Sequence, residues 1–153
     1  MTKEAASFGE VDSFRIADDL VYFSSFFPYE ISVFSLDGEL RQRFAPTRPE
    51  FGQALKRDNV TKALKFVVGT LAILPYKGRI MNVLKGRNLE TKSQYSIFDI
   101  FKEKGESITS FPATLLSEDF VVLADINHNG YLAVCATNPY PRIHVFQIGT
   151  LLQ

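Results

Sequence analysis

The residues best suited to bind a ligand are basic side chains in the middle of the chain and the tyrosines of three Pro-Tyr pairs. Residues 56–92 hold nine basic and two acidic side chains and so carry +7, while the rest of the chain carries −7. Pro-Tyr pairs recur at 28–29, 75–76 and 139–140. Cations attract anions, and a neighbouring tyrosine adds an aromatic face and a hydroxyl. The pattern predicts a face that binds an anion or an aromatic group, formed by Tyr29, Tyr76, Lys77, Arg79, Lys85, Arg87 and Tyr140.

The same residues also have a purely structural interpretation. Proline presets a turn and tyrosine fills the space beside it, so the Pro-Tyr pairs could serve only to shape loops. Basic side chains on an exposed loop can be solvated without any ligand. Both interpretations remain open from the sequence.

Signals for metal binding or catalysis are weak. Residues 125–130 match the first half of a calcium-binding loop, but Ala136 stands where that loop needs a bidentate glutamate, so we interpret them as a hairpin turn. The two histidines, His128 and His144, lack zinc-site spacing, and Cys135 lies in an apolar stretch. No P-loop, G-x-S-x-G or dinucleotide-binding motif occurs. We therefore expect no metal, no cofactor and no catalytic residue.

The elements that position these residues are predicted to be short strands in a threefold repeat. Each unit has the order strand, tight turn, strand, Pro-Tyr loop, strand, glycine turn, strand. The units span about 11–50, 59–115 and 118–153, and the third stops after its third strand. In the second unit, the loop after the Pro-Tyr pair is expected to grow into a basic insertion at 77–94. Glycine turns are predicted at 37–38, 104–105 and 129–130, because glycine accepts positive φ.

The strand segments predict an all-β fold made of blade-like sheets. Residues 20–23 and 120–123 are apolar without alternation, which is typical of strands buried on both faces. Four short antiparallel strands cannot bury both faces alone, but radial stacking of neighbouring sheets can. The sequence thus predicts a single domain, 1–153, with about three four-stranded blades. Phe34, Phe101 and Phe146 hold equivalent third-strand positions, and we expect all three to be buried. A short helical turn is expected at 51–57.

Residues 20–44, 95–111 and 131–148 resemble blades of six-bladed β-propellers of the NHL-like and TolB-like type. The shared pattern is Leu-Val-Tyr, then Pro-Tyr with Ile-x-Val-Phe, then Asp-Gly and a closing Phe. The resemblance implies that the chain supplies half a ring. It would be either the C-terminal part of a longer propeller or one of two copies that close a ring together.

The expected function is non-enzymatic binding or scaffolding. One alternative is a metal-dependent hydrolase of the lactonase type, for which Asp19, Asp125 and Asn127 would be the metal ligands. Another is binding of nucleic acid or another anion through residues 56–92. The expected partners are a second copy or missing N-terminal blades, together with a protein or an anionic ligand. No apolar run approaches the ~20 residues of a membrane-spanning helix, and no signal peptide is evident. The compartment is left open.

Overall fold

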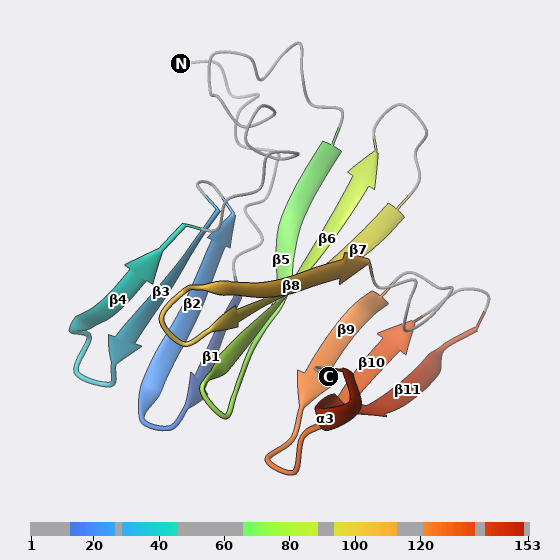
Figure 1. The fold of residues 1–153 in the computed structure, drawn as a ribbon. Coiled ribbons are helices and arrows are strands. Elements are labelled where there is room, and N and C mark those ends of the chain that lie inside the picture. Colours follow the sequence, from blue (N-terminus) through green and yellow to red (C-terminus); the bar gives the residue numbers. More distant parts are fainter. Residues whose placement is uncertain are drawn as a thin grey trace, which may run out of the picture.

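The computed structural model describes residues 13–26, 29–45, 66–88, 94–112, 121–136 and 140–151. They form three antiparallel sheets, which lie side by side in chain order (Figure 1). The first sheet contains β1 (Ser13–Ala17), β2 (Leu20–Phe26), β3 (Tyr29–Ser35) and β4 (Leu40–Phe44). The second contains β5 (Phe66–Tyr76), β6 (Arg79–Asn88), β7 (Gln94–Lys102) and β8 (Ser107–Pro112). The third contains β9 (Val121–Ile126), β10 (Tyr131–Ala136) and β11 (Arg142–Gln147), followed by the short helix α3 (Ile148–Leu151).

The all-β class and the blade-like sheets are confirmed. Each sheet is a meander in which strands adjacent in the sequence are paired, and the third sheet has three strands within the described ranges, as predicted. The helical turn expected at 51–57 lies outside the described residues. Among the described residues, no helix has the length and apolar character needed to cross a membrane.

Tight turns produce these meanders, and the predicted glycine turns are confirmed. Gly38, Gly105 and Gly130 all have positive φ between paired strands. In the segment that resembles half a calcium loop, the Asn127 side-chain oxygen accepts hydrogen bonds from the backbone N–H groups of Asn129 and Tyr131, each 3.0 Å long. Such local bonds are how asparagine stabilises a turn, so the hairpin interpretation of this segment holds.

The basic loop predicted at 77–94 is wrong, because most of it is strand β6. This strand pairs with β5 along its length and with β7 on its other side. Ile80, Met81, Val83 and Leu84 are all buried, so the segment contributes to the core on both faces of the sheet. The turn lies at 77–78 instead, where both residues have positive φ, as two-residue hairpins of type I′ require.

The second sheet is covered on both faces. On one side, Tyr22, Ile31 and Val33 of the first sheet pack against Ile73, Ile80 and Phe101. On the other side, the second sheet packs against the third through a larger cluster that includes Phe98, Ile100, Leu132 and Val134. The first strands of the three sheets lie side by side, since β1 contacts β5 and β5 contacts β9. An ion pair between Arg15 and Asp125 joins the first and third sheets there.

The burial predicted for three equivalent phenylalanines is only partly correct. Phe101 is buried, whereas Phe34 and Phe146 are half-buried. All three belong to the same repeated sheet face. In the second sheet this face is covered by the first sheet, but in the first sheet no described sheet covers it. Phe146 packs against the core from β11, an edge strand among the described strands.

Candidate functional site

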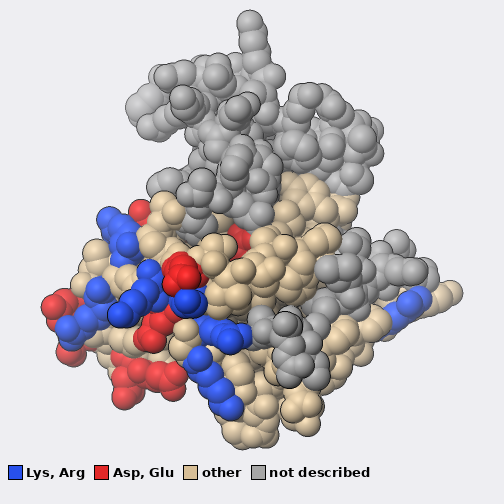
Figure 2. All heavy atoms as spheres, in the orientation of Figure 1, with Lys and Arg blue, Asp and Glu red and all other residues tan. Residues whose placement is uncertain are grey.

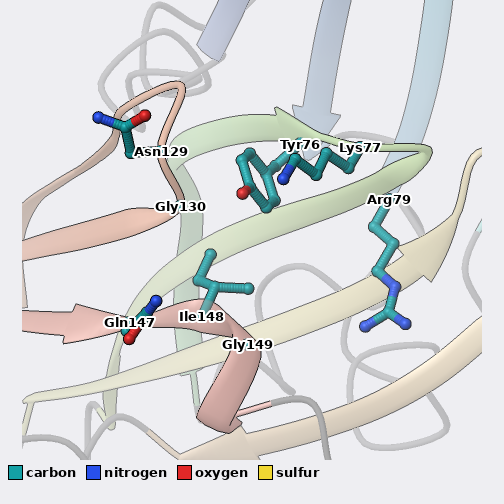
Figure 3. Close-up of a pocket in the computed structure, with 8 residues that line it drawn as sticks. All are labelled: Tyr76, Lys77, Arg79, Asn129, Gly130, Gln147, Ile148 and Gly149. Atoms are coloured by element: carbon teal, nitrogen blue, oxygen red, sulfur yellow. The ribbon is translucent and has the colours of Figure 1, made fainter.

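A pocket of about 480 Å³ lies between the second and third sheets. Figure 3 shows that its walls come from the β5–β6 hairpin on one side, and from the β9–β10 turn and the start of α3 on the other. The lining residues are Tyr76, Lys77, Arg79, Asn129, Gly130, Gln147, Ile148 and Gly149. The meeting of two hairpin turns and one strand end therefore creates the site.

Close packing holds the tyrosine wall of the pocket in place. Tyr76 ends β5 and packs against the core between the second and third sheets. Its ring lies directly over Gly130, so close that a Cβ on that glycine would come 2.8 Å from Tyr76 Cζ and nearer still to the hydroxyl oxygen. The Ile148 N–H donates to the Gly130 carbonyl at 2.8 Å, which ties the helix to the turn. Tyr76 is thus fixed by a position that only glycine fills.

The pocket is positively charged. Among the described lining residues, Lys77 and Arg79 are the only ionisable ones apart from Tyr76, and none carries a carboxylate. Within the described ranges, neither cation is engaged in an ion pair. The Lys77 ammonium lies 5.1 Å from the centre of the Tyr76 ring, at cation–π distance. The side-chain amides of Asn129 and Gln147 add donors and acceptors, so the site could hold an anion with an attached polar group.

The positive field is local, because carboxylates lie outside the pocket at the same end of the sheets. Glu103 donates its backbone N–H to the Gly78 carbonyl at 2.9 Å, and its carboxylate oxygen would be 3.9 Å from a Cβ on Gly78. Figure 2 shows Lys and Arg side chains interleaved with Asp and Glu side chains over the first sheet and the β7–β8 turn. A large, uniformly basic surface is therefore not present on the face shown.

The structure brings together three of the seven predicted binding residues, Tyr76, Lys77 and Arg79. Lys85 lies further along β6, opposite Gly69, and does not line the pocket. Arg87 also belongs to β6, but its side chain is outside the described residues. Tyr140 is exposed before β11, at the opposite end of that strand from Gln147.

Tyr29 is not a surface binding residue, and this corrects the prediction. It is only 6% exposed, because it begins β3 on the face that the second sheet covers. Its hydroxyl donates to Asp99 Oδ2 at 2.9 Å and accepts from Asn82 Nδ2 at 3.0 Å. A hydrogen bond of 3.0 Å between Ser24 and Thr70 adds to this buried polar contact. Tyr29 thus joins the first two sheets rather than facing a ligand.

The three residues weighed as metal ligands have other roles. Asp19 occupies the β1–β2 turn, Asp125 pairs with Arg15, and Asn127 closes the β9–β10 turn. The described residues contain no group of three His, Cys, Asp or Glu side chains placed to hold a metal ion.

The sequence did not single out Gln147, Ile148 and Gly149 as pocket residues. Gln147 ends β11, Ile148 and Gly149 begin α3, and no motif marks them. Asn129 and Gly130 were recognised only as a turn. Neither protein-family models nor curated proteins match the chain, so a role for the pocket has to be inferred from its chemistry.

Proposed function

We propose that this chain is a non-enzymatic binding module of the β-propeller type, and that the pocket between its second and third sheets receives a small anion. The observation that carries the proposal is the placement of Lys77 and Arg79 beside the Tyr76 ring in one pocket, whose described lining residues include no carboxylate. A guanidinium can bind a carboxylate or phosphate in a bidentate manner, and an ammonium adds a second charge.

The size of the pocket favours a small ligand over a polymer. Its volume of about 480 Å³ lies in the usual range of small-molecule sites. A nucleic acid would need a longer track of cations. Lys77 and Arg79 lie at one end of β6, and Lys85 lies well along it. The turns of the first sheet and the β7–β8 turn contain acidic residues, namely Asp18, Asp19, Glu39 and Glu103. A small phosphate or carboxylate compound is therefore preferred over a polyanion.

The propeller-type assignment is supported by the way the sheets stack. Each sheet is a meander, the first strands lie side by side, and both faces of the second sheet are covered. The first and third sheets each leave an apolar face open, with Phe14 and Ile16 on one and Ile143 and Val145 on the other. We infer that the module is completed by self-association, since exposed faces of this kind are stabilised by burial.

Binding of inorganic phosphate, citrate and a single-stranded oligonucleotide would test the ligand class. The readout is amide chemical shifts at Lys77 and Gly130, with affinities from titration. We expect phosphate or citrate to shift these signals, with affinity falling as salt rises. The double variant Lys77→Gln/Arg79→Gln should bind at least about tenfold more weakly, since bonds to charged groups contribute about 1.5–3 kcal/mol.

Lys85→Gln is the matched control, because it removes one charge of the same segment outside the pocket. It should bind like the wild type. Equal affinity of the double variant and the wild type would refute the pocket as the anion site. Tight binding of the oligonucleotide that depends equally on Lys85 would favour the polyanion alternative.

A further inference from the structure

Equivalent residues of the three sheets differ sharply in exposure. Val33 and Ile100 each precede a bulge in the pairing with the next strand, which aligns the third strands of the first two sheets. The sequence pattern Ile-x-Val-Phe aligns β11 with them. Ile31 and Phe98 are both 0% exposed, but the equivalent Ile143 is 72% exposed. Val33 is 4% and Ile100 1% exposed, but the equivalent Val145 is 60% exposed.

The difference follows from which faces are covered. We call this repeated face of each sheet the trailing face. In the first sheet it is covered by the second sheet, and in the second by the third. In the third sheet no described element covers it. The strand register places eight side chains on the open trailing face, six of them without charge or amide groups and two polar: Leu123, Tyr131, Ala133, Cys135, Ile143 and Val145, with Asp125 and Gln147.

The opposite, leading face shows the reverse pattern. Phe101 lies on the leading face of the second sheet and is buried by the first sheet. The equivalent Phe34 lies on the leading face of the first sheet and is half-buried. Register pairs place it on one side of the first sheet with the apolar residues Phe14, Ile16, Val21, Phe23 and Leu40, and with the polar residues Ser25, Glu30, Ser32 and Arg43. Phe14 is 68% and Ile16 59% exposed, so this face is open as well.

We infer that the open trailing face of one copy packs on the open leading face of a second copy. This inference rests on the self-association proposed above and specifies which faces meet. Within the chain, both sheet-to-sheet contacts join a trailing face to a leading face, with first strands side by side. The contact between copies has the same arrangement, with the trailing face of one sheet against the leading face of the next. A two-fold axis makes the contact twice and closes two chains into one body of six sheets.

The area is close to what a stable pair needs. With strands about 4.8 Å apart and about five residues each at 3.4 Å, the four-stranded first sheet offers a face of roughly 330 Å² and the three described strands of the third sheet roughly 240 Å². Two interfaces bury two faces of each kind, or roughly 1,100 Å², which is near the lower limit for stable and specific interfaces. Because these faces carry apolar side chains at most positions, a second copy with the complementary face is the occupant that the repeat favours.

The test uses the full chain and measures mass by light scattering and sedimentation between about 1 and 100 µM. The wild type should be a dimer. Ile16→Lys charges the leading face and Val145→Glu the trailing face, so each variant alone should be a monomer. An equimolar mixture should form dimers again, because one of the two interfaces in the mixed pair is wild type on both sides and the other joins opposite charges.

Ile108→Lys is the matched control, because Ile108 is an exposed apolar residue of β8 in the second sheet. It should stay dimeric, and circular dichroism should show all variants folded. A monomeric wild type overturns the inference. A dimer that persists in either single variant indicates pairing of like faces and also overturns it, as does a mixture that stays monomeric. Phosphate binding is measured with the same proteins. A protein that binds phosphate but does not dimerise contradicts only the inferred interface, and a dimer that does not bind phosphate contradicts only the proposed pocket.

Discussion

Replacing Gly130 by alanine tests the packing that builds the pocket. The new Cβ would lie 2.8 Å from Tyr76 Cζ, a separation at which one of the two groups must move. Gly130 also has a φ of +82°, a conformation that an L-residue with a side chain rarely adopts. The substitution therefore combines two separable penalties, one from the backbone and one from the Tyr76 ring.

Gly38→Ala isolates the backbone penalty. Gly38 has a nearly identical φ of +84°, but a Cβ there would meet nothing within 4 Å. The left-handed conformation costs about 1–2 kcal/mol, so this is the expected destabilisation for Gly38→Ala. Overpacking typically adds about 1–3 kcal/mol, which brings the expected loss for Gly130→Ala to about 2–5 kcal/mol.

The assay is urea unfolding followed by circular dichroism at one protein concentration, since pairing of copies would couple stability to concentration. A double-mutant cycle with Tyr76→Leu identifies the clash, because the shorter side chain lacks the ring that the Cβ would touch. In that background the cost of Gly130→Ala should fall to that of Gly38→Ala. Equal costs for the two alanine substitutions in the wild-type background, or a difference that persists in the Tyr76→Leu background, would refute the packing argument.

Three further predictions concern the interface between the first two sheets. Phe101→Ala should lower the free energy of unfolding by about 3–5 kcal/mol, because this buried ring packs against Phe44; a loss under about 1 kcal/mol in urea unfolding would contradict the core described here. Tyr29→Phe should cost about 1–3 kcal/mol by the same assay, because its hydroxyl bonds to Asp99 and Asn82 within the interface; an unchanged midpoint would show that these bonds contribute nothing. Burial, and then the carboxylates of Glu103 and Asp18, raise the pKa of Tyr22 above its usual value near 10. The folded state therefore keeps this proton to higher pH than the unfolded chain, so the stabilisation is complete below about pH 10 and is lost as pH rises further. Tyr22→Phe should flatten the alkaline loss of stability, and parallel pH profiles for the two proteins would contradict this.

The sheet order and the turns could be predicted because the signals are local. A glycine between two apolar stretches accepts the positive φ that a tight hairpin needs, and this holds at Gly38, Gly105 and Gly130 whatever the sheets pack against.

The loop predicted at 77–94 in the second sheet was wrong because basic residues and the Pro-Tyr pair were interpreted as loop signals. Pro75 lies inside β5, where proline is tolerated because β5, among the described strands, pairs only with β6 and its other edge needs no N–H. The Pro-Tyr pair therefore ends a strand here, although it precedes one at Tyr29. Lys85 is a half-buried residue of β6, and a long aliphatic stem can lie along apolar surface while its charge reaches water. Basic residues thus did not mark a loop.

The pocket could not be found from the sequence, because its walls meet only through packing between sheets. Tyr76 and Gly130 are far apart in the sequence and touch because the second and third sheets share a core. Lys77 and Arg79 were identified by their charge, but their separation from Lys85 depends on the strand between them. The sequence therefore identified three of the residues and missed the arrangement that makes them one site.

The residues at the open faces carry the argument for a partner surface. A repeat protein whose terminal unit meets water usually changes that unit, replacing apolar positions with polar ones to stay soluble. Here the third sheet keeps Ile143 and Val145 at positions where the first two sheets have buried Ile31, Phe98, Val33 and Ile100. The first sheet likewise keeps Phe14 and Ile16 exposed. Apolar side chains therefore lie at both ends of the stack, and no described element covers them. This is the arrangement expected if the two faces bury each other.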